Sequence, residues 1–375
     1  MKFRVSQIEF SKALSVCDKS LPAKANLPIL ANVLLVASKN TLEVVSTNLE
    51  TATKVNITCK AEQEGGITLP GKILSELVSQ LPEGEITLEK LGEEMLVSAS
   101  SDTARFATMN PEDFPAIPKI EKGRQIKIDG HEFIRCIEKV EFCAAQDESR
   151  PILSGVLVEI DKKKLSLVST DGYRLSFVST TLNGVAEPLK LVIPAKTLGE
   201  VGKIIAEYLE GGKDQDVTLV IADNLNQVNF KIGDIEFTSR LIEGEFPNWQ
   251  KIIPSVFTTK IRLSKAVFNK QIRIASIFAR DAGNIVRLKF EGKTLTTMAN
   301  TSQVGSNEAK VETTEMTGKG GEIAFNYRYL QDAFSVIDSE DLIFEMIESL
   351  SPGRITGFDD KDDFFHIIMP VRLQG

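Results

Sequence analysis

The chain is poor in the side chains that most often carry out chemistry in proteins. Its 375 residues include one tryptophan and two histidines, His131 and His366, and neither histidine has a cysteine or aspartate at metal-ligand spacing. The four cysteines show no C-x-x-C spacing, and Cys17 falls on the apolar side of an expected helix, where a free thiol packs as a small hydrophobe. We therefore expect no metal site, no disulfide, no cofactor and no histidine-based catalysis.

Long apolar runs are also missing. No stretch approaches the 18 or more apolar residues needed to span a membrane. The opening residues MKFRV alternate as in a strand and lack the apolar region of an export signal. With 42% hydrophobic and 26% charged residues, the composition predicts a soluble, cytoplasmic protein.

The sequence repeats itself. A shift of 123 positions places Phe10 on Phe133 without a gap, and a third, more divergent copy begins near Ile261. The same shift also pairs Lys12 with Arg135, Leu14 with Ile137, residues 28–30 (PIL) with 151–153, and residues 45–47 (VST) with 168–170. A repeat of roughly 125 residues is long enough to close its own core. The pattern predicts three similar domains, at residues 1–122, 123–255 and 256–375, with joints at residues 121–124 and 254–255.

Each repeat predicts an α+β domain with two helices on an antiparallel sheet. The first helix is expected over residues 6–19, where Phe10, Leu14 and Cys17 share one face. Alternating strands follow, as at residues 41–45 and 164–168. A second helix is expected to begin near Pro70, Pro194 and their counterpart Asn326.

Basic residues recur at equivalent helix positions in all three copies. One position holds Lys12, Arg135 and Lys270, and the other holds Lys72, Lys196 and Arg328. Lysine and arginine make up only 44 of 375 residues, so six basic residues out of six indicate more than a solvated surface. Further basic residues that extend these helices are Lys19, Lys139, Lys203 and Arg273. The pattern predicts basic helix faces for a polyanion, and the net charge of −8 does not prevent this because charges act over a Debye length of only about 8 to 10 Å.

Two stretches resemble catalytic motifs but favour other interpretations. Residues 66–72 fit the GxxxxGK spacing of a phosphate-binding loop, but Ile73 replaces the required Ser or Thr, and Pro70 stiffens the loop and removes an N–H. The acidic run at residues 359–363 is interpreted as a hairpin turn between strands 354–358 and 364–369. Neither predicts an enzyme.

The whole chain resembles the bacterial sliding clamps, the beta subunits of the replicative DNA polymerase III. The motifs that carry the resemblance are MKF at residues 1–3, LPIL at 27–30, STDGYRL at 169–175, EFP at 245–247 and MPVRL at 369–373. The resemblance implies a ring-shaped head-to-tail homodimer, with helices lining a central hole and the sheets outside. Such a ring encircles double-stranded DNA without reading its sequence, tethers the polymerase and so confers processivity in DNA replication.

The resemblance also assigns residues to three surfaces. DNA contacts would include Lys24 and Arg150 beside the six helix positions. The dimer seam would join Arg105 and Phe106 of the first domain to Ile277 and Phe278 of the third. A groove between the second and third domains would bind short peptide motifs of the polymerase, the clamp loader and other partners. Its residues would be Leu153, Thr170, Gly172, Tyr173, Arg174, Leu175, Pro247, Ile252, Tyr329, Ile367, Met369, Pro370, Val371, Arg372 and Leu373.

Two departures from the clamp pattern stand near the groove. The chain continues past Leu373 with Gln374 and Gly375, and Lys251 occupies a position where some clamps have arginine. Neither is expected to close the groove. Two alternatives stay open at this point: an enzyme such as a nuclease that uses clustered carboxylates, and a protein-only scaffold whose basic helices bind acidic partners.

Overall fold

The computed structural model describes residues 1–117, 120, 123–147, 149–210, 216–224, 226–301, 305–359 and 363–372. The chain forms two compact units. One contains residues 1–131 and 200–241, and the other contains residues 132–199 and 242–375. We call them unit 1 and unit 2 and describe each by itself.

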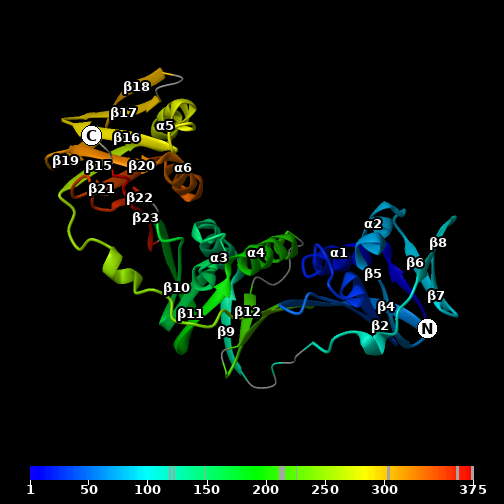
Figure 1. The fold of residues 1–375 in the computed structure, drawn as a ribbon. Coiled ribbons are helices and arrows are strands. Elements are labelled where there is room, and N and C mark those ends of the chain that lie inside the picture. The colour runs from blue at the N-terminus through cyan, green and yellow to red at the C-terminus, as the bar shows by residue number, and fades with distance from the viewer. Residues whose placement is uncertain are drawn as a thin grey trace. The chain divides into compact units, whose positions relative to one another are not determined.

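Six helices of eight residues or more lie in the described chain, two in each sequence repeat (Figure 1). They are α1 (Gln7–Asp18), α2 (Gly71–Gln80), α3 (Gly130–Glu138), α4 (Ala195–Leu209), α5 (Lys265–Ala279) and α6 (Tyr327–Val336). Short 3-10 turns separate several elements, and those used below are η4 (Pro151–Ser154) and η5 (Trp249–Ile252).

Unit 1 is built on one large antiparallel sheet. Its main path runs β8-β7-β6-β1-β4-β14-β13-β12-β9, while β2, β3 and β5 join it beside β4. The strands are β1 (Lys2–Ser6), β2 (Asn32–Ser38), β3 (Thr41–Thr47), β4 (Thr51–Gln63), β5 (Gly65–Pro70), β6 (Glu85–Leu91), β7 (Glu94–Ala99), β8 (Asp102–Ala107), β9 (Gly123–Asp129), β12 (Asp216–Ala222), β13 (Gln227–Ile232) and β14 (Ile235–Arg240). The β4–β14 pairing joins the first repeat to the second, with Ala52 opposite Thr238.

Unit 2 contains two antiparallel sheets. The larger has the order β10-β11-β23-β22-β21-β15-β19, and the smaller has the order β18-β17-β16-β20. The strands are β10 (Gly155–Thr170), β11 (Arg174–Pro194), β15 (Thr259–Ser264), β16 (Ile285–Glu291), β17 (Thr294–Thr301), β18 (Gly305–Glu312), β19 (Glu315–Thr317), β20 (Gly321–Asn326), β21 (Asp341–Met346), β22 (Gly353–Gly357) and β23 (Asp363–Ile368). Here β11 of the second repeat pairs with β23 of the third, with Phe177 opposite Phe365.

The helices pack as their periodicity predicts. Phe10, Leu14 and Cys17 lie on one face of α1 and are fully buried against the sheet. The Cys17 thiol donates to the Val44 carbonyl of β3 at 3.5 Å. In the third repeat, Phe268 of α5 and Phe334 of α6 pack with ring centroids 5.0 Å apart. The helices of the first and third repeats therefore contribute buried side chains to the core of their own repeat.

The second helix of each repeat begins where the sequence predicts. The α6 helix starts after Asn326, whose side chain accepts from the backbone N–H of Arg328 at 3.0 Å and so caps the helix. The α2 helix starts directly after Pro70, at Gly71. A Cβ atom at Gly71 would lie 2.5 Å from the side chain of Leu21, so a larger residue here would displace the leucine that follows α1.

The three-repeat α+β fold predicted from the sequence is confirmed. One predicted joint is wrong in part, because Gly123 and Arg124 already pair with β12 as the first residues of β9. The strands predicted on either side of the acidic run are present as β22 and β23. The middle of that run, residues 360–362, lies outside the described residues.

Candidate functional site: a cationic anchor and a docking surface in unit 2

The residues predicted for the partner groove centre on a tight turn between β10 and β11. The carboxylate of Asp171 accepts from the backbone N–H groups of Tyr173 and Arg174 at 2.8 and 3.0 Å. The hydroxyl of Thr170 accepts from the N–H of Gly172 at 3.0 Å and donates to the Arg174 carbonyl at 2.6 Å. Gly172 has φ of 91°, which glycine adopts without a steric penalty. The side chains of Thr170 and Asp171 and the conformation of Gly172 therefore specify this turn, whereas Tyr173 contributes only backbone groups.

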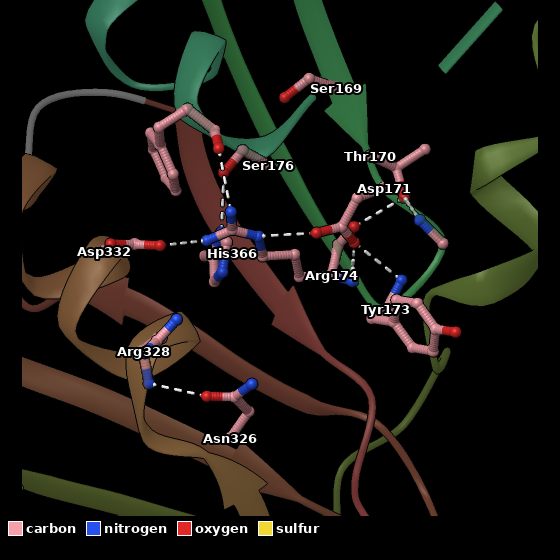
Figure 2. A network of polar contacts seen from close by, with 12 residues as sticks. Ser169, Thr170, Asp171, Tyr173, Arg174, Ser176, Asn326, Arg328, Asp332 and His366 are labelled. Carbon is pink, nitrogen blue, oxygen red and sulfur yellow. Dashed lines mark hydrogen bonds and ion pairs between the residues drawn. The ribbon is translucent and has the colours of Figure 1, made fainter. Parts of the chain in front are cut away.

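The turn aims Arg174 into a ring of partners (Figure 2). Its guanidinium, 11% exposed, donates to Asp171 at 3.1 Å, to the Phe142 carbonyl at 3.0 Å and to Asp332 of α6. It also stacks over the ring of Tyr329 at 4.6 Å. A planar guanidinium suits this arrangement because its N–H groups point in fixed directions while its face stays free to stack. Arg174 thus ties β11 to α6, from the second repeat to the third.

A buried histidine lies beside this anchor. His366 of β23 is fully buried, and its Nδ1 lies 2.7 Å from the hydroxyl of Ser176 on the neighbouring strand. Its Nε2 has no hydrogen-bond partner among the described residues. Burial lowers the pKa of His366 to about 3, and the Arg174 cation acts in the same direction. The imidazole is therefore neutral at physiological pH and is not a proton donor for catalysis.

An apolar cluster adjoins the turn. Leu175 and Ile367 pack together with Phe177 and Trp249, whose ring centroids lie 5.1 Å apart. Large, exposed apolar side chains lie two or three residues along the chain from members of this cluster. Tyr173 is 61% exposed, Ile252 38% and Met369 36%. Leu153, on η4, is buried, whereas Pro247 is exposed. A buried apolar cluster therefore lies beside the fixed guanidinium of Arg174.

The segment after β23 forms two backbone hydrogen bonds with other parts of unit 2. The N–H of Met369 donates to the Tyr173 carbonyl at 2.8 Å, and the N–H of Val371 donates to the Ala324 carbonyl at 2.8 Å. Pro370 and Val371 are partly buried and Arg372 is exposed. Leu373, the last residue predicted for the groove, lies outside the described residues.

The structure brings together most of the predicted groove residues and adds several that the sequence reasoning missed. Thr170, Gly172, Tyr173 and Arg174 form one turn, Leu175 and Ile367 share one cluster, and Tyr329 lies under Arg174. The missed residues are Asp171, Phe142, Asp332, Ser176, Trp249 and His366. Asp171 was visible in the TDGYR motif. The missed residues from other elements lie far from this motif in the sequence, so no local sequence pattern indicated them.

Five of the six recurring basic residues are exposed. Lys12, Lys72, Lys196, Lys270 and Arg328 lie on the surfaces of five different helices, and none forms an ion pair with another described side chain. Arg135, the sixth, is partly buried and ion-paired with Glu132, one turn earlier on α3. Lys24 is exposed, and Arg150 is exposed but pairs with Asp147 at 3.2 Å. The two-helix repeat thus presents free cations in each copy.

Two of the additional basic residues do not extend these faces. Lys139 is only 3% exposed and pairs with Asp338 at 3.1 Å. Lys19 is 14% exposed and pairs with Glu207 of α4 at 3.2 Å. Both follow the last residue of their helix, so the helical period no longer determines where their side chains point. Arg273 and Lys203 are exposed as predicted, with Lys203 paired to Glu200 at 3.1 Å.

The residues predicted for a dimer seam differ in accessibility. Strand β8 is an edge of the sheet of unit 1, and β18 is an edge of the smaller sheet of unit 2. Arg105 on β8 is exposed and pairs with Glu94 at 3.1 Å, whereas Phe106 is 8% exposed and packs largely within its own chain. Ile277 on α5 is 56% exposed and Phe278 is partly buried.

Within the described chain, several other kinds of site are not found. No group of three or more metal-ligating side chains is present, and no helix is long and apolar enough to cross a membrane. All four cysteines are buried and unbridged, and burial raises the pKa of the Cys136 and Cys143 thiols to about 12. The GxxxxGK residues form strand β5 and the start of α2, so they do not make a loop that could wrap a phosphate.

Three tandem two-helix repeats on antiparallel sheets, with exposed cations on their helices, define the class of the three-domain clamps. Sequence models of the DNA polymerase III beta subunit match in chain order: its N-terminal domain at residues 1–118, its central domain at 127–248 and its C-terminal domain at 250–372.

Known relatives agree along the whole chain. The chain is 30% identical over 396 residues to the beta sliding clamp of Synechocystis sp., with 100% of both chains covered, and 26% identical over 382 residues to that of Staphylococcus epidermidis, with 99% of both covered. Among solved structures it resembles the DNA polymerase III beta subunit of Thermotoga maritima (TM-score 0.92, 26% identity) and a sliding clamp of Pseudomonas aeruginosa bound to griselimycin (TM-score 0.92, 25% identity), with 100% of each chain covered. The chain belongs to the beta sliding clamp family. It is a DNA sliding clamp of replication, a non-catalytic factor that works with DNA and with the polymerase.

Proposed function

We propose that two copies of this chain join head to tail into a ring that encircles double-stranded DNA. The observation that carries the proposal is the recurrence of exposed cations without an ion-pair partner among the described residues, in all three repeats, at Lys12, Lys72, Lys196, Lys270 and Arg328. Contacts from such flexible cations to phosphates are independent of sequence, so the ring slides while it stays on the duplex. The repeats act as domains at residues 1–122, 123–255 and 256–375, and the protein works in the cytoplasm, where the chromosome of a bacterium is copied.

The free sheet edges support a closed assembly. Strand β8 in the first repeat and strand β18 in the third each leave a row of backbone groups without a strand partner among the described residues. In a head-to-tail dimer, β8 of each copy pairs with β18 of the other. The two equivalent seams leave neither edge unpaired and close the ring. Arg105 and Phe106 would face Ile277 and Phe278 of the second copy across this seam.

The surface around Arg174 supports a second role, the docking of short peptide motifs from the polymerase, the clamp loader and other DNA-processing proteins. The exposed Tyr173, Ile252 and Met369 provide apolar contact area beside a fixed turn. A rigid site of this kind gives affinity from few deep contacts. Once docked on a ring around DNA, the polymerase rebinds its primer end at high effective concentration after each dissociation.

The decisive experiment compares closed and cut DNA. Protein loaded on a nicked plasmid circle by a clamp loader should remain bound through gel filtration in about 0.2 M salt. The same complex should lose its protein when one restriction cut makes the DNA linear. Equal loss from circular and linear DNA would contradict encirclement. Binding of acidic proteins with no retention on any DNA would favour the protein-only scaffold instead.

A further inference from the structure

The junction between the first and second repeats copies the architecture of the surface around Arg174. In unit 1 the strands follow the order β3-β4-β14-β13-β12-β9, and in unit 2 the order β10-β11-β23-β22-β21-β15. The registers agree as well. Ala52 lies opposite Thr238 as Leu175 lies opposite Ile367, and the shift of 123 residues relates Ala52 to Leu175. A docking surface in unit 2 therefore has a structural counterpart in unit 1.

The connecting segments repeat the same way. Residues 114–115 (FP) lie near the end of the first repeat, and residues 246–247 (FP) lie near the end of the second, which places Ile117 in the position of Trp249. Phe114 packs on Val45 with Ile117 close by, as Phe246 and Trp249 pack on Val168. Both connectors thus cross the same face of equivalent sheets.

The two junctions differ in how fully they are filled. In unit 2 the space under the connector holds the rings of Phe177 and Trp249. The unit 1 counterparts are Lys54, which pairs with Glu43 at 2.7 Å, and the smaller Ile117. A cavity of about 500 Å³ remains there, with Val45, Phe114 and Ile117 among its lining residues. This volume lies within the range of small-ligand sites.

A polar atom in this cavity lacks a partner. Asn229, 6% exposed, lines the cavity and donates from Nδ2 to the Thr238 hydroxyl at 2.8 Å. Its Oδ1 accepts no hydrogen bond from any described residue. A buried carbonyl oxygen without a donor is costly, and a ligand N–H would satisfy it.

A smaller cavity beside this one is lined by an exposed leucine in the left-handed region. Leu49 has φ of 76° and is 48% exposed, at the position equivalent to Gly172, which has φ of 91°. A residue with a side chain is disfavoured in the left-handed region, so Leu49 destabilises the fold locally. Backbone strain of this kind is often found at binding surfaces. Leu49 borders a smaller cavity of about 110 Å³ that shares Ala52, Ile117 and Thr238 with the larger one.

We propose that this junction is a second docking site, which binds a short extended peptide of a partner protein by taking one large apolar side chain into the cavity beneath Phe114 and Ile117 and one backbone N–H onto the Asn229 carbonyl. A peptide fits because it supplies the apolar group and the donor from adjacent atoms, as the equivalent surface of unit 2 uses apolar contacts beside a polar anchor. The site is separate from the Arg174 surface, so a clamp could hold two partner segments on one chain.

Disulfide capture tests the proposal directly, because all four native cysteines are buried and leave an introduced thiol as the reactive one. Glu50, an exposed residue that lines the smaller adjoining cavity, is replaced in the full-length protein (Glu50→Cys). The probes are the cysteamine disulfides of acetyl-leucyl-phenylalanine and acetyl-glycyl-glycine, at graded concentrations of 2-mercaptoethanol. Intact-protein mass spectrometry measures the captured fraction. The leucyl-phenylalanyl probe should withstand about tenfold more reductant than the glycyl probe, as burial of one apolar side chain predicts.

Three controls separate the proposed site from general stickiness. Lys60→Cys, on the same strand β4 and outside the cavity lining, should capture both probes equally. Adding Ile117→Trp, which gives unit 1 the side chain of its unit 2 counterpart, should abolish the preference while thermal unfolding shows an intact fold. Methylation of the probe's internal amide nitrogen should weaken capture about tenfold, because Asn229 loses its donor. Removal of residues 369–375 should leave the preference unchanged.

Other outcomes would overturn the proposal. Equal capture of the two probes by Glu50→Cys, or the same preference at Lys60→Cys, would show that the cavity selects no apolar peptide. An unchanged preference after amide methylation would remove Asn229 from the site. Disulfide-linked pairs of chains in place of captured probe would assign the junction to a second copy of the clamp.

Discussion

Arg174 and Asp332 form an ion pair that connects the first residue of β11 to the middle of α6. The arginine is mostly buried, whereas the aspartate is 44% exposed. One side chain therefore fixes the turn beneath the proposed docking surface and also binds the second repeat to the third.

Replacing this arginine should weaken unit 2. We expect Arg174→Ala to lower the free energy of unfolding by about 2 kcal/mol, because Asp332 and the Phe142 carbonyl lose the guanidinium donor and Asp171 keeps only its backbone donors. Trp249, the only tryptophan, lies in the cluster of unit 2, so its fluorescence in urea reports on this unit. Lys164→Ala, which breaks the exposed pair with Asp363, is the control and should cost less than about 0.5 kcal/mol. Equal effects of both variants would refute the anchoring role.

The buried histidine should make stability depend on pH. His366 has a folded-state pKa of about 3, below the ordinary value of 6.5, so the unfolded chain binds the proton more tightly. Its contribution to stability is fully present above pH 6.5 and is lost as the pH falls from 6.5 towards 3, by up to about 1.4 kcal/mol per pH unit. His366→Leu should flatten the urea midpoint between pH 7 and 4.5 relative to wild type. His131→Gln, at an exposed position, should keep the wild-type slope.

The C-terminal segment should be needed for partners and not for assembly. Removing residues 369–375 eliminates the backbone hydrogen bonds from Met369 to Tyr173 and from Val371 to Ala324. We expect loss of polymerase stimulation in a primer-extension assay, while light scattering still reports a dimer. Full stimulation by the truncated protein would move the docking surface elsewhere.

The exposed helix cations should govern retention on DNA. The triple variant Lys12→Glu, Lys196→Glu and Lys270→Glu should dissociate faster from circular DNA. It should also reduce the slope of log K against log salt by about 0.9 for each phosphate that the variant no longer neutralises. The matched control replaces Lys39, Lys60 and Lys127, three exposed lysines outside the helices, with glutamate. A control variant that releases DNA as readily as the helix variant would show that only net charge matters.

The proposed seam makes a prediction for α5. Ile277→Asp should weaken dimerisation by roughly 100-fold or more, because a buried carboxylate replaces an apolar contact. Val267→Asp alters the same helix at another exposed position and should leave the dimer unchanged. Sedimentation at micromolar protein distinguishes the two. A dimer that survives Ile277→Asp would place the seam away from this helix.

The sequence predicts the repeated architecture well because the three repeats can be compared with one another, as homologous sequences are in an alignment. Phe10 and its counterparts Phe133 and Phe268 are all fully buried, and the equivalent charged positions keep their helical setting. Periodicity predicts these positions because every residue lies inside a regular helix, where the helical repeat fixes the direction of each side chain. It fails for Lys19 and Lys139, which lie beyond the ends of their helices and turn towards acidic partners.

The anchor could be predicted only in part. The TDGYR turn is local, so its residue types specify their own hydrogen bonds. Asp332 and His366 reach Arg174 and Ser176 through the pairing of β11 with β23, which joins two different repeats. No pattern within one repeat encodes a contact that crosses into the next.

That same exchange of strands between repeats has a consequence for biosynthesis. In a growing polypeptide the first repeat emerges complete in sequence, yet from Thr51 to Val55 the side of β4 that faces away from β3 has no neighbouring strand until β14 has been translated. An unpaired edge attracts other strands. The nascent chain therefore exposes an unpaired strand edge, which is prone to aggregation, during most of the synthesis of the second repeat. A chain whose synthesis stops in that interval is expected to need a chaperone.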